Sequence, residues 1–181
     1  MRSPWIVLLV GCGSSVPASS VPASSVPASS VPASSVPLNV DEERAAIRQV
    51  LDDWHDAASD ADEERYFGHF TSDAVFLGTD ATERWTLDEF RAYAHPHFER
   101  GRAWSFRATR RAVIVDEEGR LGWFDEELAT EGLGPARGSG VVRNEHGTWR
   151  IAHYNLTLTV PNERMREVKE LLAADPAPPS N

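Results

Sequence analysis

The sequence predicts an α+β domain in which a curved antiparallel sheet wraps around N-terminal helices. Two observations lead to this fold class. Apolar residues recur at helical spacing between residues 41 and 95, and after Gly101 their period changes from about 3.6 to about 2 residues. The chain has 181 residues, and the part from Asp41 onward is long enough for one domain with its own core.

Three helices are expected before the long strands. The first covers residues 41–58 and begins with three acidic residues, which suit the positive end of a helix dipole. The second is short and is capped by Asp60. After a brief strand at residues 74–77, the third opens with the capping-box pattern Thr86-Leu87-Asp88-Glu89 and is expected to end at His95-Pro96, because proline interrupts helical hydrogen bonding.

Two long hairpins and a last helix follow. Residues 104–114 alternate apolar and polar side chains, and the turn after them leads into a second strand at residues 121–130. Residues 138–144 and 148–160 form the second hairpin. Pro161-Asn162 then begins a C-terminal helix. The three earlier helices precede a run of antiparallel strands, which is the element order of an α+β fold.

Charge and cysteine content exclude several classes of function. From Asp41 onward the chain carries 17 basic and 28 acidic residues, a formal charge of −11. Nucleic acids and anionic membrane surfaces are contacted by Lys and Arg, so neither is an expected partner. The single cysteine is Cys12, so the domain has neither a disulfide framework nor a Cys-ligated zinc site.

The first twelve residues are typical of an export signal. A short apolar run follows Arg2 and is too short to span a bilayer. Leu9-Val10-Gly11-Cys12 resembles the bacterial lipobox, in which the cysteine is lipidated and becomes the mature N-terminus. The resemblance implies a protein anchored by Cys12 in the cell envelope, and Gly13 after the cysteine implies the outer membrane in a Gram-negative cell. The alternative is a chance free cysteine in an unstructured leader.

A five-residue repeat links this signal to the domain. Ser-Ser-Val-Pro-Ala recurs between Ser14 and Pro37, with a proline at every fifth position. Regular prolines exclude a helix, so residues 13–38 are expected to form an extended tether that reaches on the order of 70 to 80 Å. A Pro-rich ligand for another protein is the alternative, but no charged or aromatic residues accompany the repeat.

Four stretches of the domain resemble one family in their order and spacing. They are residues 70–79, 121–127, 137–142 and 149–163. Together they resemble the SnoaL-like branch of the nuclear transport factor 2-like superfamily, and the resemblance covers most of residues 41–166. It implies a cone-shaped fold, open at one end, that encloses a pocket, and homodimers packed sheet to sheet. We expect the domain at residues 39–175, followed by a disordered tail at residues 176–181.

The same resemblance does not imply one activity. The superfamily includes ketosteroid isomerase, scytalone dehydratase and polyketide cyclases, together with members that only bind or associate, so fold alone does not give function. The isomerase oxyanion hole needs a tyrosine from the first helix. That helix has no tyrosine here, and Trp54 and His55 occupy its later turns.

Strand alternation predicts which polar side chains face the pocket. Trp123 and Asp125 share one face of the second long strand, and His153 and Asn155 share one face of the last. We expect both faces to point inward. Asp125 and His153 are then candidate catalytic residues, because a carboxylate can orient an imidazole as a general base near neutral pH. The alternative is a hydrogen-bonded core His153 and an ion pair between Asp125 and Arg137.

The other candidates are expected to bind ligand. The full set of predicted ligand-binding residues is Trp54, Trp85, His95, Trp123, Arg137 and Asn155. Trp54, Trp85 and Trp104 could instead pack in the core. His95 and His97 have no recognised zinc spacing, so no metal is predicted. No phosphate-binding loop, nucleophile elbow or dinucleotide fingerprint is present, so no cofactor is predicted.

Three functions remain open on the sequence. The first is an envelope-anchored domain that binds a small, partly apolar molecule in its cone. The second is an isomerase, dehydratase or hydrolase that uses His153 and Asp125 as acid and base. The third is an interaction module that binds a protein through its outer sheet face.

Overall fold

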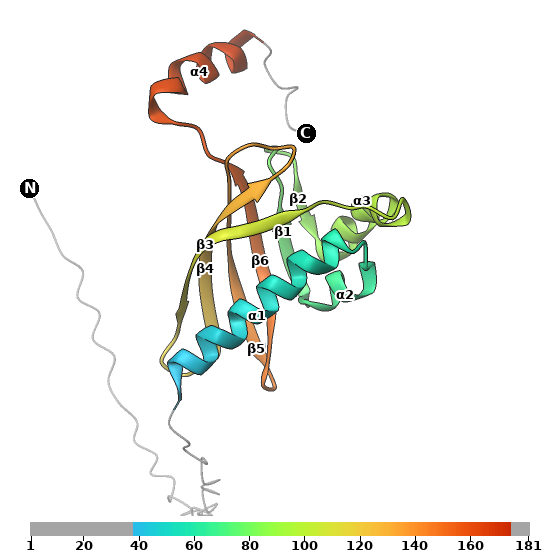
Figure 1. The fold of residues 1–181 in the computed structure, drawn as a ribbon, viewed down its shortest axis with the longest axis vertical. Helices are drawn as coiled ribbons and strands as arrows, with labels where there is room; N and C mark the ends of the chain where they lie inside the picture. The colour runs from blue at the N-terminus through green and yellow to red at the C-terminus, as the bar shows by residue number, and fades with distance from the viewer. Residues whose placement is uncertain (1–37, 175–181) are drawn as a thin grey trace, which may run out of the picture. The chain divides into compact units, whose positions relative to one another are not determined.

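The structure is a computed structural model that describes residues 38–174 (Figure 1). The predicted export signal with Cys12, nearly all of the tether and the C-terminal tail lie outside the described residues. The elements are α1 (Val40–Ser59), α2 (Glu63–Gly68), β1 (Phe70–Leu77), β2 (Arg84–Thr86), α3 (Leu87–Glu99), β3 (Phe106–Val115), β4 (Leu121–Thr130), β5 (Ala136–Glu145), β6 (Thr148–Leu158), η1 (Asn162–Arg164) and α4 (Met165–Ala174). Helices therefore precede a long-stranded sheet, as the sequence predicts.

The capping box predicted for α3 is confirmed, because Thr86 and Glu89 form it, and Asn39 caps α1. The cap predicted for α2 is wrong: Asp62 caps this helix, and Asp60 instead follows the last residue of α1. The prediction that α3 ends at Pro96 is wrong, because the helix continues to Glu99. Phe98, in this last turn, is buried among aromatic side chains, and its packing offsets the hydrogen bond that proline cannot donate.

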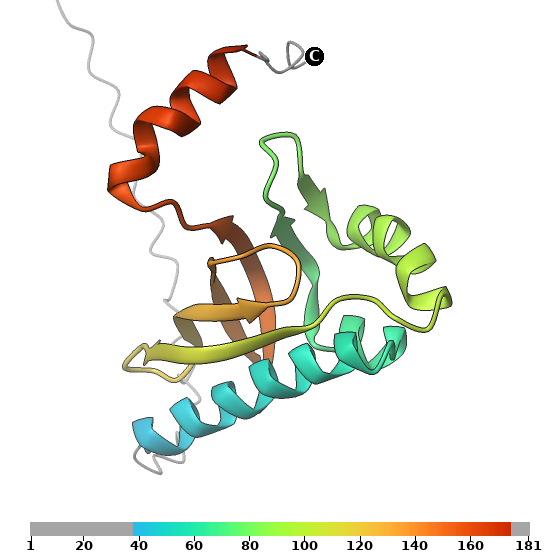
Figure 2. The ribbon, with the colours of Figure 1, turned by 45° about the horizontal axis from the view of Figure 1, so that its top comes forward.

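The six strands form one curved sheet in the order β2-β1-β6-β5-β4-β3. Neighbouring strands are antiparallel except β1 and β6, which are parallel, so the sheet is mixed and not wholly antiparallel. α1 crosses the concave face, and α2 and α3 lie near the C-terminal end of α1 (Figures 1 and 2). This is a cone-shaped α+β fold with the helices on the concave side of the sheet.

Two irregularities decide which residues face the helices. The pairing register shifts between Ala108 and Arg110 in β3, and between Ile151 and His153 in β6. A bulge adds a residue to one strand, so the alternation of inward and outward side chains is reversed beyond it. In β6, Ile151 is buried before the bulge and Tyr154 is buried after it.

The deep part of the concave face is filled by aromatic side chains. Trp54 from α1 lies with its ring centre 5.3 Å from that of Tyr66 and 4.6 Å from that of Tyr154. All three are almost completely buried. Burial of several aromatic rings supplies a large share of the hydrophobic stabilisation in a domain of this size.

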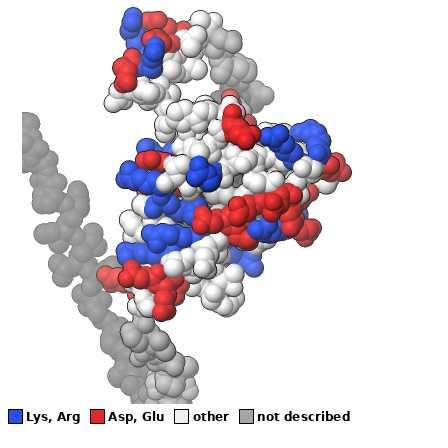
Figure 3. Space-filling view, viewed as in Figure 1, with Lys and Arg blue, Asp and Glu red and all other residues white. Residues whose placement is uncertain are grey.

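The charged surface is organised along α1. Figure 3 shows acidic side chains along this helix beside Arg side chains of the adjoining strands. One such contact joins Arg111 of β3 to Asp52 of α1, with 2.7 Å between Nη1 and Oδ1. The negative charge is therefore partly balanced where helix and sheet meet.

The last helix makes little contact with the sheet. α4 buries none of its residues and leaves Leu171 and Leu172 exposed. Across residues 38–174, no helix combines the length and the apolar character that crossing a membrane requires.

Candidate functional site

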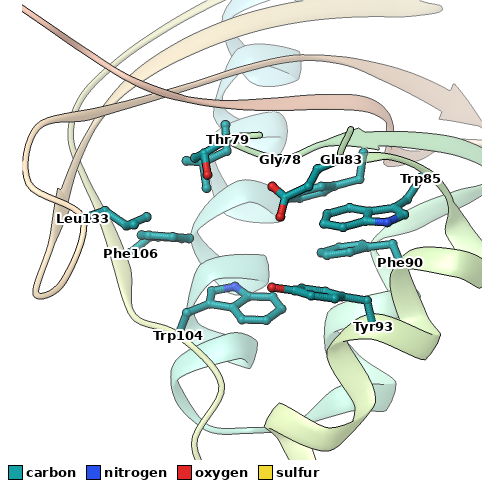
Figure 4. Close-up of a pocket in the computed structure, with 11 residues that line it drawn as sticks. Gly78, Thr79, Glu83, Trp85, Phe90, Tyr93, Trp104, Phe106 and Leu133 are labelled. Carbon is teal, nitrogen blue, oxygen red and sulfur yellow. The ribbon is translucent and has the colours of Figure 1, made fainter. Parts of the chain in front are cut away.

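A pocket of about 210 Å³ opens between the β1–β2 hairpin, α3 and the start of β3 (Figure 4). Eleven residues line it. They are Phe76, Gly78, Thr79, Glu83, Trp85, Phe90, Tyr93, Trp104, Phe106, Leu133 and Leu156. The lining is predominantly aromatic and aliphatic, with few polar groups, which is the usual composition of a small-molecule site.

One wall of this pocket is a stack of aromatic rings. Trp85 lies nearly parallel to Phe90, with ring centres 5.7 Å apart, and 4.7 Å from Tyr93. Phe76 stacks on the other side of Phe90 at 3.9 Å. Trp104 lies on the opposite side of the pocket from Trp85 in Figure 4. The rings support one another, so the wall is formed before any ligand arrives.

Glu83 is the one carboxylate of the lining, and Figure 4 shows it directed into the space between the aromatic walls. A tight turn places it there. The N–H of Glu83 donates to the carbonyl of Asp80 at 3.0 Å, and the N–H of Asp80 donates to Glu83 Oε2 at 3.1 Å. Gly78 lies directly against this side chain, where a Cβ would collide with the carboxylate.

A second carboxylate, Glu126 of β4, lies deeper in the cone and is completely buried. His55 of α1 donates from Nε2 to its Oε1 at 2.8 Å, and the Tyr154 hydroxyl donates to the same oxygen at 3.2 Å. Arg111 of β3 donates from Nε to Oε2 at 2.7 Å. Both oxygens of Glu126 therefore have partners from surrounding elements, as a buried charge requires.

The charges of this buried cluster set its protonation. Burial alone would raise the pKa of Glu126, but hydrogen bonds and positive charge from His55 and Arg111 outweigh it and lower the pKa. Burial, reinforced by the Glu126 carboxylate, raises the pKa of Tyr154 well above its ordinary value. Tyr154 therefore keeps its proton and remains a donor. In the part of the chain that the structure describes, no three His, Cys, Asp or Glu side chains gather as a metal site.

Aromatic packing separates the cluster from the pocket. Phe76 lines the pocket and stacks on Tyr154, with ring centres 5.4 Å apart. Phe106 also lines the pocket and contacts His55 edge-on at 6.3 Å. The polar cluster thus supports the pocket floor without opening into it.

Four predicted site residues lie on the opposite face of the sheet. In β4 the residues that alternate with Trp123 and Asp125 are buried, and both of these are exposed. In β6 the bulge after Ile151 turns His153 and Asn155 away from the face that carries Tyr154. The expectation that these four side chains point inward is therefore wrong, and Asp125 and His153 do not line the pocket.

The other predicted residues are dispersed. Trp85 lines the pocket, whereas Trp54 is buried in the aromatic core. His95 is a surface residue with Nδ1 2.7 Å from Glu63, whose hydrogen bond and charge raise the pKa of His95. Arg137 is exposed on β5 and pairs in register with Glu127, not with Asp125. Trp85 is therefore the one member of the predicted ligand-binding set in the pocket.

The sequence contains one signal that identifies the inward face of β4. Gly138 and Gly140 pair with Glu126 and Phe124. A Cβ at Gly138 would meet the Tyr154 hydroxyl and Glu126, and one at Gly140 would meet the backbone carbonyl of His153 and the ring of Phe124. Alternate glycines in a strand mark a face where large neighbours approach closely. Glu83 has no such signal, because its direction depends on the turn.

Solved structures with the same fold include proteins of different named activities. One is a protein from Novosphingobium aromaticivorans proposed to be an aromatic ring hydroxylase, with 21% identity, a TM-score of 0.58 and coverage of 67% of this chain and 92% of the other. Another from that organism, proposed to be a scytalone dehydratase, has 13% identity, a TM-score of 0.55 and coverage of 66% and 85%. A nuclear transport factor 2-like protein of unknown function from Pseudomonas putida has 14% identity, a TM-score of 0.56 and coverage of 68% and 91%. At these identities the likeness concerns the fold.

Sequence comparison extends this result to the family. No curated protein matches the chain significantly. The SnoaL-like domain family matches residues 47–161, which include every strand and most of α1. This match covers more than half of the chain and agrees with the cone-shaped fold. The chain therefore belongs to the SnoaL-like domain family.

Proposed function

We propose that this protein is an exported, lipid-anchored SnoaL-like domain that binds a small, partly apolar molecule in the pocket at the mouth of its cone. The observation that carries the proposal is the aromatic pocket of about 210 Å³, which has a wall of stacked rings and one inward carboxylate. Such a cavity would lose apolar contacts if it stayed empty, so an apolar body is the occupant it favours.

The geometry does not favour the acid/base mechanism predicted from the sequence. The proposed acid/base pair needs Asp125 and His153 to meet a substrate in the cone, and both lie on the other sheet face. The buried His55 and Glu126 are hydrogen-bonded to each other behind the pocket floor. General acid or base catalysis requires a group within hydrogen-bond reach of the substrate, directly or through one water.

Native mass spectrometry of the full chain, purified gently from its source cells, tests ligand binding. We expect a reproducible small adduct that denaturation removes. Trp104→Ala should lose the adduct because it removes a pocket wall, whereas Trp123→Ala, on the other sheet face, should keep it. A clean mass for the unaltered protein, or an adduct that only Trp123→Ala loses, would contradict binding in this pocket.

The outer face of the sheet favours a second role, association between two copies of the chain. Ile114, Trp123, Val141 and His153 are aligned in register across β3 to β6. Trp123 is 47% exposed and Ile114 45% exposed, so this row presents apolar surface to solvent. A row of large apolar side chains on a sheet face is typical of an interface.

Sedimentation equilibrium on the full chain tests this association. We expect a dimer, and we expect Trp123→Glu to dissociate it by burying a charge at the interface. Leu171→Glu on α4 is the matched control, because Leu171 is exposed away from the sheet. A monomer at tens of micromolar, or dissociation by Leu171→Glu alone, would rule out the interface.

Anchoring rests on Cys12 and the apolar run before it. We expect the protein in the membrane fraction, with a diacylglyceryl mass on the N-terminal peptide that begins at Cys12. Cys12→Ala should release the protein from membranes. Membrane association that survives Cys12→Ala would overturn the lipid anchor.

A further inference from the structure

The pocket carries one negative charge that the surrounding residues leave uncompensated. Within residues 38–174, Glu83 forms no ion pair with Lys, Arg or His, and the pocket lining contains none of these residues. The backbone N–H of Asp80 binds Oε2, while Oε1 has no hydrogen-bond partner in the described part of the chain. Half of the carboxylate is thus available to a ligand.

The rings around Glu83 supply apolar contact surface. Trp85, Tyr93 and Trp104 come from β2, α3 and the segment before β3. Trp85 stacks on Phe90 and on Tyr93, so these rings cover part of its faces. The rings therefore favour an apolar body, and the Glu83 carboxylate selects the charge of the ligand.

This combination discriminates between classes of ligand. An anion would be repelled by Glu83, and a wholly apolar molecule would cover the carboxylate without a partner, which costs free energy. An organic cation satisfies both features, because its charge meets Glu83 and its apolar groups contact the rings. A hydrated metal ion would form few favourable contacts with the aromatic walls, because it prefers oxygen ligands.

We propose that the pocket binds an organic ammonium compound, with the cationic group between Glu83 and the Trp85 and Trp104 rings and an apolar or aromatic body along the rest of the lining. This inference rests on the proposed function, since it assigns a ligand class to the same pocket. Gly78 is part of the arrangement, because any side chain there would displace the Glu83 carboxylate.

A matched pair of probes separates charge from shape. 3-Hydroxyphenyltrimethylammonium and 3-tert-butylphenol have nearly the same size and differ in the charge of one quaternary centre. Each is titrated into the full chain while the indole N–H signals of tryptophan are followed by NMR. Trp85 and Trp104 report on the pocket, and the exposed Trp123 is the internal control on the other face.

We expect both probes to shift Trp85 and Trp104 and to leave Trp123 unchanged, with the cation bound about 10-fold more tightly. Glu83→Gln keeps the side-chain shape and its acceptor for the Asp80 N–H. It should remove most of the preference for the cation, because Glu83 supplies the negative charge of the pocket lining. Glu127→Gln, on the outer face of β4, should leave the preference unchanged.

The outcomes separate the two proposals. Equal affinity for the two probes at Trp85 and Trp104 would overturn the cation preference while supporting a small-molecule pocket. A preference that Glu83→Gln does not change would overturn the role of Glu83. If neither probe shifts these signals, the pocket proposal fails and the ligand class fails with it.

Discussion

Two carboxylates point into the same cone and have opposite environments. Glu126 is fully buried and accepts hydrogen bonds on both oxygens from α1, β3 and β6. Glu83 lies at the mouth, and one backbone N–H binds it. A carboxylate with protein partners on both oxygens, such as Glu126, holds elements together. A carboxylate with one free oxygen, such as Glu83, can bind a ligand.

The largest effect should come from removing the buried carboxylate. Glu126→Ala leaves Arg111 and His55 buried without their shared partner, so the free energy of unfolding should fall by about 3–5 kcal/mol. Glu127→Ala, next in the strand but exposed, should change it by no more than about 0.5 kcal/mol. Urea unfolding measures the free energy of unfolding of both variants. Equal losses would mean that the buried cluster stabilises the fold no more than an exposed glutamate does.

Adding a methyl group beside the cluster should have the next largest effect. In Gly138→Ala the new Cβ meets the Tyr154 hydroxyl and Glu126, so we expect a loss of about 1–3 kcal/mol. Gly132→Ala is the control, because nothing lies within reach of its Cβ. If thermal unfolding shows the same loss of stability in both variants, the close contact at Gly138 is not the reason for a glycine at this position.

The stability of the protein should depend on the charge of Glu126. Its pKa is lowered in the folded state relative to the ordinary value of 4.5, so its contribution is present above that value and is lost as pH falls through the folded pKa. The stability difference between the unaltered protein and Glu126→Gln should therefore be constant near neutral pH and shrink below about pH 4.5. Urea midpoints measured from pH 7 to pH 3 test this, and a difference independent of pH would contradict it.

The smallest effect on stability should come from the carboxylate at the mouth. Glu83→Gln keeps the acceptor for the Asp80 N–H and breaks no ion pair within residues 38–174, so the unfolding free energy should change by less than about 0.5 kcal/mol. The same urea experiment provides the comparison with Glu126→Gln. A loss as large as that of Glu126→Gln would show Glu83 to be structural.

The sequence predicted the elements better than the directions of their side chains. Helical spacing, capping residues and strand alternation gave α1, the start of α3 and β4 close to their observed bounds. Alternation cannot reveal a bulge, which depends on pairing with another strand. The bulge in β6 is what moved His153 and Asn155 to the outer face. On β4 the wrong face was chosen because Trp123 looked like a core residue, although Gly138 and Gly140 pointed to the other face.

The candidate site was harder to predict than the fold. Trp54, Trp85 and Trp104 were equal candidates for pocket walls or for the core, and only the structure shows that Trp85 and Trp104 line the pocket while Trp54 is in the core. Glu83 was not, because one loop carboxylate among 28 acidic residues has no distinguishing local pattern. Its role arises from the turn at Asp80 and from the room at Gly78, both of which appear only in three dimensions.

The parallel pairing of β1 with β6 has a consequence for biogenesis. These strands are far apart in the sequence and adjacent in the sheet, and the pocket uses Phe76 from β1 and Leu156 from β6. Contacts of this kind form late, since a long loop must close first. A nascent chain that has not yet released residues 148–158 from the ribosome cannot complete the cavity, so any occupant must bind after synthesis of the domain is finished.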